Sequence, residues 1–158
     1  MQEKQRLVEI ERKFLVTSED YKSQAVKHYE IVQGYLCREP GKTIRVRIRD
    51  NQAFLTIKSS RLYEGIARFE WEKEIDVKEA KALLQLALPG LIDKTRWIIP
   101  AEGSQLVWEV DEFHGRHEGL VIAEIELEDE AQAFDKPTFI GKEVTGDPRY
   151  YNANLIEA

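Results

Sequence analysis

The chain has 158 residues, 42% of them hydrophobic and 33% charged, and it carries a formal net charge of −6 at pH 7. This length suits a single domain over residues 1–158 with a substantial core, and the negative charge argues against a general nucleic-acid-binding protein. The lone cysteine, Cys37, excludes an intrachain disulfide and a cysteine-based zinc site, and the lack of a long apolar run or signal-peptide core predicts a cytoplasmic protein without a membrane partner.

The first predicted strand is the segment at residues 9–16, which reads EIERKFLV. At the two-residue period of a strand, Glu9, Glu11 and Lys13 share one face, and the apolar residues share the other. Two carboxylates so close together repel each other unless a cation lies between them. This face is therefore suited to a hard divalent cation such as Mg²⁺, although a solvated strand face explains the segment equally well.

The rest of the chain predicts a mainly β protein with a few helices. Alternation of polar and apolar residues predicts about eight strands in all, at residues 9–16, 30–36, 43–50, 53–60, 68–75, 93–100, 105–113 and 120–128. Helical spacing or capping residues predict helices at 21–26 and 77–88, the second ended by Pro89 and Gly90. We expect a tail of loops and short helices, with a closing helix at 150–156.

The polar faces of at least six of these strands are almost entirely charged. The acidic candidates are Glu9, Glu11, Glu70, Glu72, Glu109, Asp111, Glu124 and Glu126. The basic candidates are Lys13, Arg45, Arg47, Lys58, Arg68, Lys94 and Arg96. An antiparallel sheet with one solvated face accounts for the alternation, but it accounts less well for the scarcity of uncharged polar residues.

A closed barrel with the charges inside is the alternative to a solvated sheet, since closure removes the sheet edges. Burying so many charges is costly unless they pair with one another or bind ions. Arginine and lysine bind phosphate oxygens, and carboxylates hold divalent ions that bridge phosphates. The pattern thus favours a tunnel that processes phosphates, with the solvated sheet left open.

Several short motifs, in order along the chain, resemble those of the CYTH superfamily, also called the triphosphate tunnel metalloenzymes. They are Glu9–Lys13 (ExExK), Thr43–Arg47 (paired arginines), Thr56–Lys58 (TxK), Arg68–Glu72 (RxExE), Lys94–Arg96 (KxR), Glu109–Asp111 and Glu124–Glu126. Asp93 stands where this family often has a glutamate, which leaves the basic roles unaffected. One ExExK alone is a weak signal, but so many ordered matches in 158 residues are specific.

The resemblance implies an eight-stranded antiparallel closed β-barrel with a few covering helices, and an enzyme that needs Mg²⁺ or Mn²⁺. It implies hydrolysis of a small-molecule triphosphate, and the short chain is most similar to the bacterial inorganic triphosphatases of this family. A class IV-type adenylyl cyclase, or a nucleotide or thiamine triphosphatase, is the second reading. A non-catalytic polyphosphate binder ranks lower, because binding alone does not need clustered carboxylates. Monomer and homodimer both remain open.

The resemblance also implies roles for individual residues. The expected catalytic set is Glu9, Glu11, Lys13, Glu70 and Glu72. The expected substrate-binding set is Lys13, Arg45, Arg47, Lys58, Lys94 and Arg96. The expected metal ligands are Glu9, Glu11, Asp111, Glu124 and Glu126. Structural ion pairs remain an alternative for the late acidic positions, Glu109 above all. The histidines His28, His114 and His117 show no ligand spacing, so we expect surface or loop positions for them.

Overall fold

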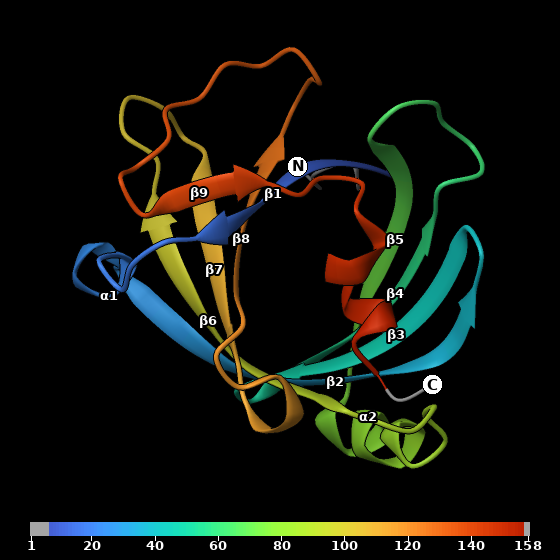
Figure 1. Ribbon diagram of the computed structural model, residues 1–158. Helices are drawn as coiled ribbons and strands as arrows, with labels where there is room; N and C mark the ends of the chain where they lie inside the picture. Colours follow the sequence, from blue (N-terminus) through green and yellow to red (C-terminus); the bar gives the residue numbers. More distant parts are fainter. Residues whose placement is uncertain (1–6, 157–158) are drawn as a thin grey trace, which may run out of the picture.

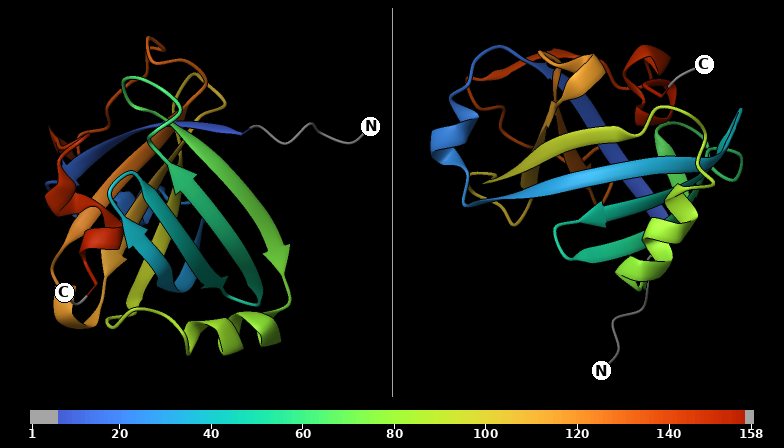
Figure 2. Two further views of the ribbon diagram at one scale, coloured as in Figure 1. Left: turned by 90° about the vertical axis from the view of Figure 1, so that its right-hand side faces the viewer. Right: turned by 90° about the horizontal axis from the view of Figure 1, so that it is seen from below.

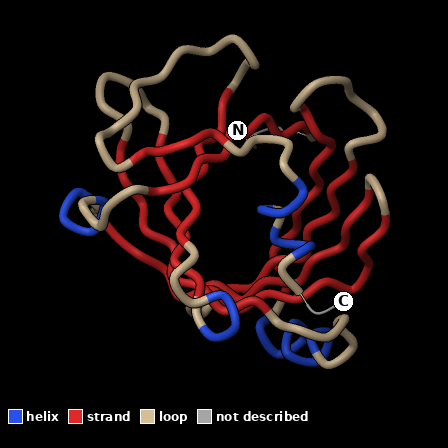
Figure 3. The backbone as a smooth tube through the Cα atoms, viewed as in Figure 1, coloured by secondary structure: helices blue, strands red, loops and turns tan. Residues whose placement is uncertain are grey.

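The computed structural model describes residues 7–156, and in this part of the chain eight antiparallel strands close into a barrel (Figures 1 and 3). The strands are β1 (Val8–Val16), β2 (Lys27–Glu39), β3 (Lys42–Arg49), β4 (Gln52–Ser59), β5 (Ala67–Ile75), β6 (Ile92–Pro100), β7 (Val107–Phe113) and β8 (Val121–Leu127). Their order around the barrel is β5-β4-β3-β2-β6-β7-β8-β1, and β1 returns to β5. The predicted mainly β, eight-stranded closed barrel is confirmed.

The barrel closes at β1, which pairs with strands on both of its edges. Residues 8–10 pair with residues 67–69 of β5, and residues 10–15 pair with residues 122–127 of β8. The end of β1 also pairs with a short ninth strand, β9 (Ile140–Glu143). The motif that runs from Glu9 to Lys13 therefore lies where the two ends of the sheet meet.

Most apolar side chains of the strands point outward, and the largest hydrophobic cluster lies on the outside of the barrel wall. A second cluster, with Tyr35, Phe113 and Ile122, shares the inner face with Lys94 and Asp111 and packs against the C-terminal segment. Phe14 of β1 packs edge-on against Trp108 of β7, with ring centroids 5.5 Å apart. Tyr21 of the short helix α1 (Tyr21–Gln24) packs against Trp97 and Phe139. This outer layer covers the apolar faces, so the charged faces are left inside.

The second helix, α2 (Val77–Leu84), covers the outer face of β2, β3 and β4 and lies below the barrel in Figure 1. It begins at Asp76, whose side chain accepts a hydrogen bond from the backbone N–H of Lys78. It buries Ala80 against Val46 and Ala53. On the same face of β2, Gly34 leaves no room for a side chain, since an added Cβ would lie 2.7 Å from Leu91 Cδ2.

The predicted end of α2, at residue 88, is wrong. The helix ends at Leu84 rather than residue 88, and tighter turns follow it. The backbone N–H of Leu88 donates to the Tyr35 carbonyl on β2 at 2.8 Å, so the chain leaves the helix to meet the sheet. β2 is longer than predicted because it pairs along its length with β3 on one edge and β6 on the other.

The C-terminal segment also differs from the prediction. Instead of one helix at 150–156, the chain forms two 3-10 turns, η2 (Pro148–Tyr150) and η3 (Asn152–Asn154), and β9 was not predicted. A third such turn, η1 (Gly115–His117), follows β7. Figure 2 shows η2 and η3 (red) at one end of the barrel. Among the helices at residues 7–156, none has the length and apolar character needed to cross a membrane.

Candidate active site

Strand register brings the predicted site residues together on the inner wall of the barrel. Directly paired residues of antiparallel strands share a face of the sheet. The pairs are Glu9 with Arg68, Glu11 with Glu126, Lys13 with Glu124, Lys58 with Glu70, Arg96 with Asp111, and Glu109 with Glu124. Arg45 lies opposite Thr56, which in turn lies opposite Glu72. Only 7% of Arg47 and 1% of Asp111 is exposed, so the solvated-sheet alternative is wrong.

One group of charges ties β1 to β4 and β5. The Lys58 ammonium lies 2.9 Å from Glu9 and 3.4 Å from Glu70. The Arg68 guanidinium donates to both Glu9, at 2.7 Å, and Glu11, at 2.8 Å. Burial by itself would raise the pKa of Glu9. The positive charge of Lys58, a hydrogen bond with Glu70 and the positive charge of Arg68 together outweigh burial and hold this pKa well below its usual value. Glu9 is therefore ionised and held by basic neighbours.

A second group ties β6 to β7. Arg96 makes a bidentate contact with Asp111, at 2.8 and 2.9 Å, and donates to Glu109 at 2.9 Å. The Lys94 ammonium also lies 2.8 Å from Asp111. Burial lowers the pKa of Lys94 to about 8, although Asp111 acts in the opposite direction. Burial would raise the pKa of Asp111, but Arg96 and Lys94 hold it far below its usual range.

Two of the three arginines of β3, Arg45 and Arg47, have much looser partners. Their nearest carboxylate is Glu72, at 3.8 Å from Arg45 and 3.7 Å from Arg47. Within residues 7–156, the Nε atoms of both arginines are buried and lack a hydrogen-bond partner. Burial, followed by the charges of Arg45 and Arg96, lowers the pKa of Arg47 to about 9. An anion with several acceptor oxygens would satisfy these donors and offset the crowded positive charge.

Carboxylates crowd on the opposite side, where Glu11 lies directly across from Glu126. Burial, followed by the charges of Glu124 and Glu9, raises the pKa of Glu11 to about 8. Burial, followed by Glu9, raises the pKa of Glu126 to about 7. Burial would also raise the pKa of Glu124, but Lys13, at 3.4 Å, outweighs it and brings this pKa to about 2. Such a set of oxygen donors fits a hard divalent cation, which would relieve their repulsion.

A model of the CYTH domain matches residues 7–151. The chain belongs to the CYTH family. It is 49% identical over 150 residues to an inorganic triphosphatase of Acetivibrio thermocellus, in a match that covers 94% of this chain and 93% of that protein. It is 39% identical over 154 residues to an inorganic triphosphatase of Nitrosomonas europaea, with 94% and 97% covered. The resemblance inferred from the motifs is confirmed.

The CYTH fold is also evident among solved structures. The chain superposes on the crystal structure of the inorganic triphosphatase NE1496 with a TM-score of 0.65 and 32% sequence identity. That superposition covers 93% of this chain and 96% of the other.

The C-terminal segment of this CYTH domain contributes residues that the sequence did not reveal. Asn152 Oδ1 accepts hydrogen bonds from Lys94 Nζ at 2.9 Å and from Gln33 Nε2 at 3.2 Å. Lys13 Nζ donates to the Tyr150 carbonyl at 3.0 Å and lies 5.5 Å from the ring centre of Tyr151. Two basic residues of the candidate site are thus positioned by a segment that no motif marks.

The charged wall of the CYTH barrel encloses space for a ligand. An inner cavity of about 90 Å³ is lined by residues of both signs, among them Glu11, Arg45 and Lys94. A cavity of about 690 Å³ shares several of these lining residues and lies at the β2–β3 turn, where it includes Arg38 and Lys42. An anion can therefore approach the inner wall from the end of the barrel where η2 and η3 lie.

Proposed function

We propose that this protein is a divalent-metal-dependent triphosphatase that hydrolyses inorganic tripolyphosphate to pyrophosphate and phosphate inside the barrel. The observation that carries the proposal is the pair Arg45 and Arg47, whose buried Nε donors lack partners while carboxylates crowd the opposite wall. A linear triphosphate supplies acceptor oxygens for the arginines and, through a cation, charge balance for the carboxylates. The two curated relatives that carry the name inorganic triphosphatase support the same activity.

The basic residues would bind the substrate. Arg45 and Arg47 are two residues apart on one strand, so they project about 7 Å apart from the same face and can address neighbouring phosphoryl groups. The remaining members of the proposed binding set are Lys13, Lys58, Lys94 and Arg96. These fixed positive charges would stabilise the negative charge that moves to the pyrophosphate leaving group.

The carboxylates would hold Mg²⁺ or Mn²⁺. We assign Glu11, Glu124 and Glu126 to this role first, because Glu11 and Glu126 face each other and Glu124 is on the same strand as Glu126. Glu9 and Asp111, also predicted as ligands, each have two close basic partners, whereas Glu11 and Glu124 have one each in Arg68 and Lys13, so Glu9 and Asp111 remain the second choice. Such an ion, when bound, offsets phosphate charge and makes a water more acidic.

Two further acidic residues would act on the basic set or on water. Glu72 accepts a hydrogen bond from Thr56 Oγ1 at 2.7 Å and faces Arg45 and Arg47, so we assign it to positioning these two arginines. Burial, followed by the hydrogen bond with Glu9, raises the pKa of Glu70 to about 8. Glu70 therefore stays assigned either to holding Lys58 or to orienting the attacking water.

A product assay tests the proposal. Purified protein is given tripolyphosphate, ATP or thiamine triphosphate, with Mg²⁺, with Mn²⁺ or with EDTA, and the products are quantified. We expect equal amounts of phosphate and pyrophosphate from tripolyphosphate, with no turnover in EDTA. Cyclic AMP and pyrophosphate from ATP would show an adenylyl cyclase instead. Tight binding without any product would show a polyphosphate binder.

The domain boundaries and cellular location are part of the same proposal. We propose one CYTH-like domain over residues 1–158, which the family match over residues 7–151 supports. The cytoplasmic location remains a prediction from the sequence, and cell fractionation with an antibody against the protein tests it.

A further inference from the structure

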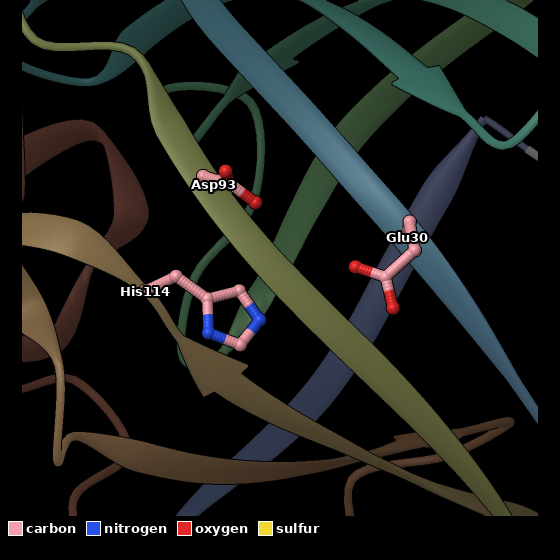
Figure 4. Close-up of side chains that lie close together, drawn as sticks. All are labelled: Glu30, Asp93 and His114. Carbon is pink, nitrogen blue, oxygen red and sulfur yellow. The ribbon is translucent and has the colours of Figure 1, made fainter.

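A second cluster of potential metal ligands lies on the outer side of the barrel. It contains Glu30 of β2, Asp93 of β6 and His114, which directly follows β7 (Figure 4). Each side chain offers one ligand atom, and these three atoms all lie within 4.8 Å of one another. Because β6 alternates, Asp93 faces away from the tunnel that Lys94 lines. The cluster is therefore separate from the candidate active site.

Hydrogen bonds hold the backbone beneath these side chains. The His114 N–H donates to the Asp93 carbonyl at 2.9 Å, which fixes the end of β7 against β6. The Glu30 N–H donates to Asp50 Oδ1, and the Asp50 N–H donates back to the Glu30 carbonyl, both at 2.9 Å. Asp50 adopts a φ of 51°, which this reciprocal pair stabilises. All three potential ligands thus project from ordered, hydrogen-bonded backbone.

The Thr95 hydroxyl links two of the three side chains. Its Oγ1 lies 3.0 Å from both carboxylate oxygens of Glu30 and 2.7 Å from His114 Nε2. This contact turns the carboxylate and the imidazole toward each other across β6, as Figure 4 shows. Hydrogen bonds of this kind orient metal ligands in proteins.

The two carboxylates of the cluster have no basic partner among residues 7–156. None of the ion pairs in this part of the chain involves Glu30 or Asp93, whereas Glu9 and Asp111 in the tunnel have two basic partners each. Two carboxylates held close together without a cation repel each other. The protein maintains this arrangement next to an imidazole, which is a metal ligand in its neutral form.

We propose that Glu30, Asp93 and His114 form a binding site for a divalent transition-metal ion of the Zn²⁺ type. One imidazole nitrogen with two carboxylates suits Zn²⁺ better than Mg²⁺, which prefers oxygen ligands alone. Three protein ligands leave a position for water. The ion would join β2, β6 and the end of β7 from outside, so its binding stabilises the folded barrel through linkage.

Histidine resonances separate this site from the tunnel, because the three histidines of the chain are His28, His114 and His117 and none belongs to the proposed tunnel set. The experiment titrates Zn²⁺ into ¹⁵N-labelled protein in excess Mg²⁺ and follows the imidazole nitrogens by NMR, with calorimetry in parallel. We expect one histidine to shift, and that shift to be absent in His114→Asn. The shift should remain in the matched control His28→Asn, because the His28 ring of the wild type packs against Trp97 and not in the cluster.

Loss of one ligand should weaken Zn²⁺ binding at least about tenfold in Glu30→Gln and Asp93→Asn. Both variants should keep their Mg²⁺-dependent tripolyphosphate turnover, which also reports that they are folded. The rise in melting temperature that Zn²⁺ causes in the wild type should be absent in both variants. Unshifted histidines, a shift confined to His28 or His117, or unchanged affinity in Glu30→Gln would overturn the proposal, whatever the outcome in the tunnel.

Discussion

Replacing Arg47 with alanine tests the proposed substrate grip most directly. Arg47 is only 7% exposed, and its Nε has no hydrogen-bond partner within residues 7–156. The nearest carboxylate, on Glu72, lies 3.7 Å from its guanidinium. The guanidinium is thus available to a phosphate oxygen at little cost in existing contacts. Loss of one charge-assisted hydrogen bond costs roughly 1.5–3 kcal/mol, which corresponds to about a ten- to hundredfold weaker affinity for tripolyphosphate.

The same substitution should leave the fold intact. Burial and the neighbouring Arg45 and Arg96 lower the pKa of Arg47, so its positive charge is disfavoured in the folded protein relative to the unfolded chain at neutral pH. Removing that charge relieves repulsion between guanidinium groups. Affinity should therefore fall while the free energy of unfolding changes by no more than about 1 kcal/mol.

The assay is calorimetric titration of tripolyphosphate and of monophosphate, with Ca²⁺ tried as a metal that does not support turnover. Arg49→Ala is the matched control: Arg49 lies on the same strand and its Nε is also buried without a partner, but its guanidinium donates to Gln52 and lies 4.5 Å from the ring centre of Tyr29 and 5.1 Å from that of Phe54. Arg47→Ala should weaken the binding of tripolyphosphate much more than the binding of monophosphate. Arg49→Ala should weaken tripolyphosphate binding less than Arg47→Ala does. Equal tripolyphosphate affinity in wild type and Arg47→Ala would refute the reasoning.

Three other substitutions probe different parts of the barrel. Glu11→Gln should keep the fold but weaken Mg²⁺ or Mn²⁺ binding and remove most turnover, because a hard cation needs the lost charge; near-normal turnover at limiting metal would contradict this. Asn152→Ala should raise KM for tripolyphosphate about fivefold, since Lys94 loses one hydrogen bond of about 1 kcal/mol, and an unchanged KM would leave Asn152 a purely structural role. Gly34→Ala should destabilise the fold by about 1–3 kcal/mol in denaturant unfolding, because its Cβ collides with Leu91; wild-type stability would show that the segment between α2 and β6 shifts freely.

The barrel and its charged interior were predictable because the period of two is a local property of a strand. In Thr43–Arg49 the arginines alternate with apolar residues, so any sheet that buries Val46 must place Arg45 and Arg47 on its other face. The same logic held for Glu9 and Lys13. Closure was not settled by the charge pattern, which left a solvated sheet open; the ordered motifs that resemble the CYTH superfamily implied the closed barrel.

Contacts between distant segments could not be read from local patterns. Asn152 meets Lys94 across 58 residues of chain, and an asparagine in a polar tail carries no marker of such a contact. His114 has no ligand spacing to Glu30 or Asp93, yet strand pairing brings the three together. The early end of α2 likewise depends on a tertiary hydrogen bond rather than on helix propensity. The site roles themselves remain predictions until the variants are measured.

The position of β1 at the seam has a consequence for how the barrel is made. β1 is synthesised before both of the strands that close it, which pair with it through residues 67–69 of β5 and 122–127 of β8. Strands β2 to β5 can each pair with a neighbour in the chain as they are synthesised. The edge of β1 that pairs with β8 must wait until β8 is made, and closing the long intervening loop costs much chain entropy. A nascent chain that stalls before residue 121 therefore presents the open edge of β1, carrying the ExExK motif, to any other unpaired strand.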